Sequence, residues 1–299
     1  MIEVKQVRKE FEDIEAVKKV NLHIEKGSIY GLLGSNGAGK TTLLKMIAGI
    51  YKQDEGQVLI EGEPVFENVG IKQKAIFLPD SLYFFPQTTI KQMAQFYESM
   101  YASWNEERFQ KLGEVFPIPV TKKIHRLSKG MQRQVAFWLA LSAMPDVLIL
   151  DEPLDGLDAV MRQKVKNLLV QDVAEREMTI LISSHNLREV EDLCDHIGIL
   201  HHGELIIEKE LDDLKSDVHK IQVAFTGDVP QAFLQDLDIL YKEQRGSVLL
   251  CIVRGKEARI TSYIQSHRPV ILDMLPLTLE EIFIYEMGDV GYAIENIIV

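Results

Sequence analysis

The sequence has little cysteine, no long apolar run and fewer basic than acidic residues, and each shortage excludes a class of protein. Cys194 and Cys251 are the only cysteines in 299 residues, and they lie too far apart to form a metal-ligand motif. No stretch approaches the ~18 uninterrupted apolar residues of a membrane helix, and the chain starts with a charged, strand-like segment rather than an apolar signal core. We therefore expect idle thiols in a reducing compartment, no transmembrane segment, and a membrane role only through a partner.

Acidic residues outnumber basic ones by 45 to 33, which gives a formal net charge of −12. Proteins that bind nucleic acid without regard to sequence usually carry the opposite sign, because neutralising phosphates supplies most of their affinity. The charge balance therefore disfavours a nucleic-acid partner, although it leaves room for a local basic groove. With 46% hydrophobic and 26% charged residues, the composition is that of a folded globular protein.

Apolar periodicity predicts an α/β domain with a largely parallel sheet over residues 1–215. Its segment 147–150 is apolar on both faces, which is typical of a central parallel strand. A helical subdomain is expected at about residues 85–145. Strands are expected over residues 3–11, 17–24, 28–33, 57–60, 75–78, 147–150 and 179–182, and helices over residues 89–101, 105–116, 129–143, 158–173 and 187–193.

From residue 216 to residue 299 the pattern changes to a smaller α+β domain. A βαββαβ order predicts a ferredoxin-like unit there. A final helix is expected over residues 278–285, and the apolar end 294–299 is either a docked strand or a dimer contact. The elements of the unit are strand 220–225, helix 230–237, strands 239–242 and 247–253, helix 257–265 and strand 269–274.

A glycine-rich loop between an apolar strand and a helix is the strongest local signal. It consists of Gly34, Ser35, Asn36, Gly37, Ala38, Gly39, Lys40, Thr41 and Thr42. Glycines allow consecutive backbone N–H groups to point at phosphate oxygens, while Lys40 reaches the β- and γ-phosphates and the Thr41 hydroxyl ligates Mg²⁺. The following helix adds its positive N-terminal end. The chain is therefore predicted to bind a nucleoside triphosphate.

Two acids follow the buried strand that ends at residue 150. Asp151 and Glu152 lie where a parallel sheet presents its carboxyl edge to ligands. Asp151 is a candidate Mg²⁺ ligand, and Glu152 is placed to polarise a water for attack on the γ-phosphate. The alternative, a helix-starting Asp-Glu-Pro turn, is disfavoured by the phosphate loop in the same chain.

With the segments 127–134 and 183–185, residues 2–214 resemble the ATP-binding cassette (ABC) ATPases, a family with the P-loop NTPase fold. The resemblance implies ATP and Mg²⁺ as ligands. It also implies a second cassette, in a homodimer or a heterodimer, arranged head to tail so that each ATP lies between two chains. The roles it implies are adenine stacking for Phe11, the signature motif for Ser128 and Gly130, the loop that crosses to the partner for Asp158, and γ-phosphate sensing for His185.

Two departures from the family pattern stand out. The signature motif is Leu-Ser-Lys-Gly-Met over residues 127–131, where the family usually has Leu-Ser-Gly-Gly-Gln. Asp80 stands where family members usually carry a glutamine that touches Mg²⁺. Asp80 is either a charged metal ligand or a loop acid turned away from the site. Both departures are similar to a subgroup of bacterial exporter cassettes that pair with separate permease chains.

The resemblance implies the ATP-hydrolysing subunit of an exporter-type transporter, located in the cytoplasm on the inner face of the cell membrane. A membrane permease would then contact the helical insertion and the Asp80 loop. The alternatives are a soluble cassette ATPase acting on ribosomes or nucleic acid, and an ATP-binding regulator without turnover. A single cassette and the acidic charge disfavour the first, and Glu152 with His185 disfavours the second. The pair His201 and His202, followed by Gly203, favours a turn over a metal site.

Overall fold

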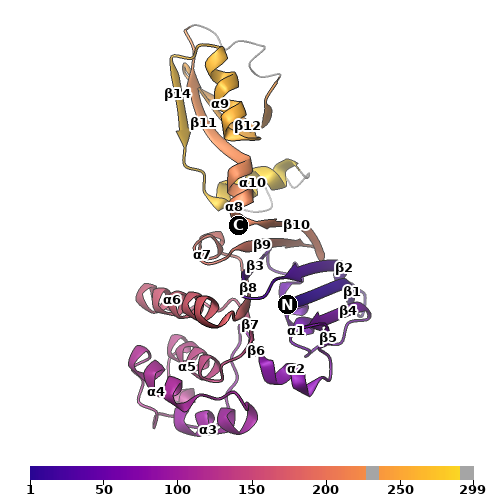
Figure 1. Cartoon of the computed structure of the whole chain (residues 1–299), viewed down its shortest axis with the longest axis vertical. Coiled ribbons are helices and arrows are strands. Elements are labelled where there is room, and N and C mark those ends of the chain that lie inside the picture. Colours follow the sequence, from indigo (N-terminus) through magenta and orange to yellow (C-terminus); the bar gives the residue numbers. More distant parts are fainter. Residues whose placement is uncertain (227–235, 290–299) are drawn as a thin grey trace. The chain divides into compact units, whose positions relative to one another are not determined.

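The computed structural model describes residues 1–226 and 236–289 (Figure 1). The chain divides into two compact units, Met1–Glu208 and Lys209–Val299. The sequence analysis ended the first domain at residue 215, but the boundary lies earlier in the chain. The short helix α8 (Leu211–Asp217) belongs to the second unit, because it packs on β11 there. Among the described residues, no helix combines the length and the apolar character needed to cross a membrane.

A six-stranded sheet forms the centre of the first unit, in the order β10-β9-β3-β8-β7-β6. The five strands from β9 to β6 pair in parallel, which confirms the predicted α/β fold with a parallel central sheet. Every residue of β3, β7 and β8 is buried. The strands are β3 (Ile29–Leu33), β6 (Ala75–Leu78), β7 (Val147–Asp151), β8 (Thr179–Ser184), β9 (His196–His201) and β10 (Glu204–Glu210).

The amino-terminal strands form a separate antiparallel sheet, in the order β2-β1-β4-β5. The sequence did not distinguish this sheet from the parallel one. Its cause is local, since β1 and β2 are joined by the two-residue turn 12–13, and so short a connection permits only antiparallel pairing. The strands are β1 (Ile2–Phe11), β2 (Ile14–Ile24), β4 (Glu55–Ile60) and β5 (Glu63–Pro64).

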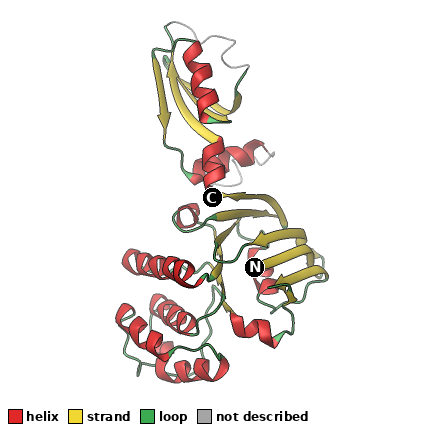
Figure 2. Ribbon diagram, viewed as in Figure 1, coloured by secondary structure: helices red, strands yellow, loops and turns green. Residues whose placement is uncertain are grey.

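The helix α1 (Lys40–Ile47) packs against both sheets of the first unit. One apolar cluster joins Val4 and Leu22 of the antiparallel sheet to Leu43 of α1 and Ile149 of the central sheet. Figure 2 shows helices α3 to α6 on one side of the central sheet and the antiparallel sheet on the other. This shared core fixes the start of α1, and with it the phosphate loop, at the carboxyl edge of the central strands.

Apart from α1, the α-helices of the first unit start at polar caps that the sequence displays. Thr89 and Gln92 form a capping box at α3, Asn105 accepts from the N–H of Arg108 at α4, and Ser128 caps α5. A short helix that the sequence analysis missed, α2 (Val69–Lys74), is capped by Asn68. The others are α3 (Ile90–Met100), α4 (Glu106–Val115), the 3-10 turn η1 (Ile124–Arg126), α5 (Lys129–Ser142), α6 (Ala159–Arg176) and α7 (Leu187–Glu191).

The second unit contains an antiparallel sheet in the order β12-β13-β11-β14, with α9 packed on one face through Ile260 and Ile264. The predicted helix 230–237 falls mainly on residues outside the described ranges, as does the apolar end 294–299. The ferredoxin-like arrangement therefore stays a prediction. The elements are β11 (Val218–Ala224), β12 (Asp238–Arg245), β13 (Val248–Arg254), α9 (Glu257–Ser266), β14 (Ile271–Leu275) and α10 (Leu279–Asp289).

Candidate functional site

The phosphate loop connects β3 to α1 and depends on glycine at defined positions. Gly34 and Gly39 have φ angles of 156° and 104°, and a Cβ at either would lie 2.3 Å from a backbone oxygen, that of Leu200 or Ala16. At Gly37, with φ of 81°, a Cβ would meet nothing within 4 Å. The first two glycines therefore allow the loop to lie against its neighbours, and the third leaves its surface open.

The Lys40 ammonium is held inside this loop. Its Nζ donates to the carbonyl oxygens of Gly34, at 2.5 Å, and Ser35, at 3.2 Å, and lies 3.7 Å from Oε1 of Glu152. Burial lowers the pKa of Lys40, and the nearby Glu152 and Asp151 carboxylates oppose that effect. Since both hydrogen-bond acceptors are loop carbonyls, the ammonium is positioned to exchange them for phosphate oxygens.

The Asp151 carboxylate is buried and bonded at both oxygens. The Thr41 hydroxyl donates to its Oδ2 at 2.9 Å, and the Ser183 hydroxyl donates to its Oδ1 at 2.7 Å. Thr41 and Asp151 thus bring a hydroxyl and a carboxylate together beside the phosphate loop, and oxygen donors of this kind fit Mg²⁺. The role of Ser183 was not predicted, although the polar run 183–185 at the end of a buried strand was a visible signal.

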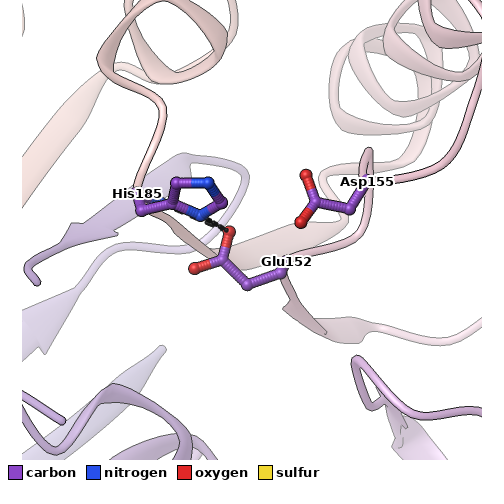
Figure 3. A group of neighbouring side chains, drawn as sticks. All are labelled: Glu152, Asp155 and His185. Atoms are coloured by element: carbon purple, nitrogen blue, oxygen red, sulfur yellow. Dashed lines mark hydrogen bonds and ion pairs between the residues drawn. The ribbon is translucent and has the colours of Figure 1, made fainter. Parts of the chain in front are cut away.

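Glu152 is held in a strained backbone conformation directly after β7. Its φ of 44° lies in the left-handed region, which costs an ordinary residue about 1–3 kcal/mol. Its N–H donates to Oγ of Ser183 at 3.1 Å. Its Oε2 lies 2.8 Å from Nδ1 of His185 and accepts from the His185 N–H at 3.3 Å (Figure 3). The surroundings therefore fix the direction of the carboxylate, as a catalytic base requires.

Apart from Gly34, the residues of the predicted phosphate loop line one cavity together with the predicted acids, and this cavity of about 670 Å³ has a size typical of small-molecule sites. His185 contacts this group through Glu152. The cavity is lined by Ser35, Asn36, Gly37, Ala38, Gly39, Lys40, Thr41, Thr42, Asp80, Asp151 and Glu152, and also by Asp13, Ile14, Glu15, Ala16, Lys18, His202 and Gly203.

The structure does not bring Phe11 to the cavity. Its ring packs edge-on against Tyr51 with centroids 5.5 Å apart, and Lys9 Nζ lies 5.3 Å from the ring centroid. Ile14, which is 70% exposed, and His202 are instead among the lining residues. His202 lies in the predicted turn between β9 and β10, and Gly203 there donates its N–H to the Ala38 carbonyl of the phosphate loop at 2.9 Å. Adenine stacking by Phe11 stays a prediction.

Ser128, Gly130 and Asp158 are not among the residues that line the cavity. Ser128 caps α5 by accepting from the Met131 N–H, and Asp158 caps α6 by accepting from the Met161 N–H. A Cβ at Gly130 would lie 2.5 Å from the Gly156 carbonyl oxygen, so the start of α5 touches the loop before α6. Within one chain, these residues shape two helix ends outside the nucleotide cavity.

Asp80 lines the cavity and is also held from the helical side. Arg133 of α5, which is buried, donates to the carbonyls of Pro79 and Asp80 at 2.9 and 2.8 Å and to Oδ1 of Asp80 at 3.2 Å. The Asp80 side chain is 58% exposed. Asp80 therefore lines the cavity and also contacts α5, and its role as a metal ligand stays a prediction.

The family model described as ABC transporter matches residues 17–155. The ABC transporter ATP-binding protein YtrB of Bacillus subtilis is 37% identical over 96% of this chain and 98% of its own length. The bacitracin transport ATP-binding protein BcrA of Bacillus licheniformis is 34% identical over 72% of this chain and 71% of its own.

Two solved structures show the same fold at 25% identity. One is an ATP-binding subunit of an ABC transporter, with a TM-score of 0.67 over 72% of this chain and 92% of its own. The other is an ATP-binding cassette solved as a dimer in a post-hydrolysis state with ADP and Pi, with a TM-score of 0.64 over 71% of this chain and 99% of its own. The chain belongs to the ABC transporter ATP-binding proteins and is an ATPase subunit of an ABC transporter.

Proposed function

We propose that this chain exports a substrate through a separate membrane permease by closing and reopening a pair of cassettes. The observation that carries the proposal is the division of the site. The phosphate loop, Asp151 and Glu152 share one cavity, whereas Ser128 and Gly130 lie outside it. A second copy or a homologous cassette supplies the missing signature contacts, which the dimeric cassette among the solved relatives supports. The relative described as a bacitracin transport protein supports movement of a substrate across a membrane.

The phosphate loop binds ATP through its N–H groups and the Lys40 ammonium. Thr41 and Asp151 would hold Mg²⁺, which when bound would supply positive charge to stabilise the phosphates. A water attacks the γ-phosphorus and gives its proton to Glu152, while the bond to the bridging oxygen breaks and ADP leaves. His185 keeps the Glu152 carboxylate in place through its ring nitrogen and its N–H.

Gly130→Ala is expected to lower turnover by ~10²–10³, the usual cost of losing one preorganised donor to the reacting charge. The added methyl group must displace the Gly156 carbonyl or the start of α5, because it would lie 2.5 Å from that oxygen. ATP affinity of the single cassette should change only a few-fold, since the residue lies outside the cavity. Steady-state turnover and equilibrium ATP binding check both statements.

Gly70→Ala provides the matched control, because a Cβ there meets only the Asn68 side chain at 3.4 Å. It should leave turnover unchanged. Turnover at the wild-type rate in Gly130→Ala would show that the signature helix does not act on ATP.

The loop before α3 and α3 itself supply the surface that we propose for the permease. Tyr83, Phe85, Phe96 and Met100 are exposed, and the Phe85 and Phe96 rings pack edge-on with centroids 5.1 Å apart. Exposed apolar groups of this kind mark interaction sites. The Asp80–Arg133 contact lies between this segment and the cavity, so the loop that holds Asp80 is placed to transmit the state of the nucleotide.

Asp80→Asn tests whether Asp80 serves the metal. We expect the Mg²⁺ concentration at half-maximal turnover to rise ~10-fold, as for loss of a charged group beside a bound metal. A titration of turnover against Mg²⁺ measures the shift. Arg133→Ala is the comparison, because it removes the hydrogen bonds from Arg133 to the Asp80 loop but keeps the Asp80 carboxylate. Equal losses in both variants without any Mg²⁺ shift would assign Asp80 a purely structural role.

A tagged chain recovered from detergent-solubilised membranes of the native host tests the transport proposal. A polytopic membrane protein in stoichiometric amount is the expected partner, and its presence would place this chain at the cytoplasmic face of the membrane. Recovery only in the soluble fraction, with ribosomes or nucleic acid, would contradict the proposal. It would leave the ATPase chemistry intact.

A further inference from the structure

The proposed catalytic base, Glu152, forms a group of metal-ligand type with two neighbouring side chains. Glu152, Asp155 and His185 each offer one donor atom, and these atoms all lie within 4.8 Å of one another (Figure 3). We propose that they bind a zinc-class divalent cation, at a site distinct from the Mg²⁺ position at Thr41 and Asp151, and that this ion inhibits turnover. The inhibitory part of the proposal rests on the proposed role of Glu152 as the base.

The donor set selects the kind of metal. Two carboxylate oxygens and one imidazole nitrogen suit Zn²⁺ and related transition metals, whereas Mg²⁺ prefers oxygen donors alone. Ligand atoms bound about 2.1 Å from one ion lie roughly 3–3.5 Å from each other. Oε2 of Glu152 and Nδ1 of His185 are 2.8 Å apart, so these two atoms have to separate slightly to admit the ion, and Asp155 has to move closer.

Two loops at the carboxyl edge of the sheet supply the ligands. Glu152 and Asp155 lie in the loop between β7 and α6, and His185 follows β8. Glu152 and His185 are held by their mutual contact and by the Ser183 hydroxyl. The Asp155 carboxylate is exposed and makes no hydrogen bond or ion pair with any other residue that the structure describes. Rotation of that side chain toward the other two therefore breaks no existing contact.

The charges around the group favour a cation on one side of Glu152. Lys40 lies 3.7 Å from Oε1, and His185 contacts Oε2, so the ammonium and the proposed ion take opposite oxygens of the same carboxylate. Two carboxylates and a neutral imidazole give a complex of zero net charge with a divalent ion. Because the ion binds Oε2 and draws negative charge from the whole carboxylate, Glu152 becomes a much weaker base toward water.

Binding of Zn²⁺ to the nucleotide-free chain tests the site directly. Calorimetric titration in excess Mg²⁺ should show one Zn²⁺ per chain, and Co²⁺ should give the visible absorption of a low-coordinate complex. Asp155→Asn should weaken Zn²⁺ binding at least ~10-fold. The same variant should keep its Mg²⁺-dependent turnover within a few-fold, and Zn²⁺ should inhibit it far less than the wild type.

Other side chains among the described residues could bind Zn²⁺, and the experiment has to distinguish them from the proposed site. Both cysteines are buried. His201 and His202, whose ring centroids are 4.1 Å apart, are the competing site, so His202→Asn should leave the Zn²⁺ affinity unchanged. Equal Zn²⁺ affinity in wild type and Asp155→Asn would overturn the proposal. Normal ATP turnover that Zn²⁺ does not affect would overturn the zinc proposal and leave the proposed function standing. Zn²⁺ binding that depends on Asp155, in a chain without ATP turnover, would contradict the proposed function alone.

Discussion

Glu152→Gln is expected to bind ATP with nearly wild-type affinity and to hydrolyse it ~10²–10⁴-fold more slowly, the usual contribution of a positioned base. The amide keeps the shape of the side chain but cannot take a proton from water. Both sides of the carboxylate are held, by Lys40 and by His185, so the substitution leaves the cavity in place. Single-turnover release of phosphate measures the loss, and size-exclusion chromatography with ATP should show an accumulated dimer.

Glu177→Gln is the matched control for that experiment. Glu177 also has a positive φ, of 54°, but its carboxylate is exposed and pairs with Lys26 away from the cavity. We expect no change in turnover there. A wild-type rate of phosphate release in Glu152→Gln would show that another group activates the water.

Lys40→Ala is expected to weaken ATP binding ~10–100-fold, because hydrogen bonds to a charged group contribute about 1.5–3 kcal/mol. Turnover at saturating ATP should fall by a further ~10²–10³, since the ammonium also faces the charge that develops during the reaction. The side chain is buried in the loop and cannot be replaced by solvent cations in the same position. Equilibrium binding of a fluorescent ATP analogue and saturating steady-state kinetics separate the two effects.

Lys45→Ala controls for loss of a lysine from the same helix. Lys45 lies in the last turn of α1, with its Nζ 5.2 Å from the Tyr51 ring centroid. Its removal should leave both ATP affinity and turnover near wild type. If Lys40→Ala and Lys45→Ala behaved alike, the loss would come from destabilisation of α1 rather than from a missing phosphate contact.

Local sequence determined the elements and the positions of the main chemical groups. Gly34, Gly37 and Gly39 allow the positive φ angles of the phosphate loop, and the capping residues Thr89, Asn105 and Ser128 start helices through contacts with residues close by in the chain. The acids at residues 151 and 152 follow an apolar strand, so they were expected at the carboxyl edge of a parallel sheet. These features depend only on residues a few positions away in the chain, so the sequence alone is enough to predict them.

Contacts between distant segments decided the rest. Ser183 reaches Asp151 across 32 positions, and Arg133 reaches Asp80 across 53, and in each case the donor hydrogen-bonds an acidic residue of the site. Tyr51, 40 positions away, packs against Phe11, which is not among the residues that line the cavity. Asp155 drew no notice in the sequence because its position beside His185 comes from β7 and β8 being neighbours in the sheet. Residue order and spacing specify the strands and loops, but strand pairing and side-chain packing choose which side chains meet, and that choice requires the folded chain.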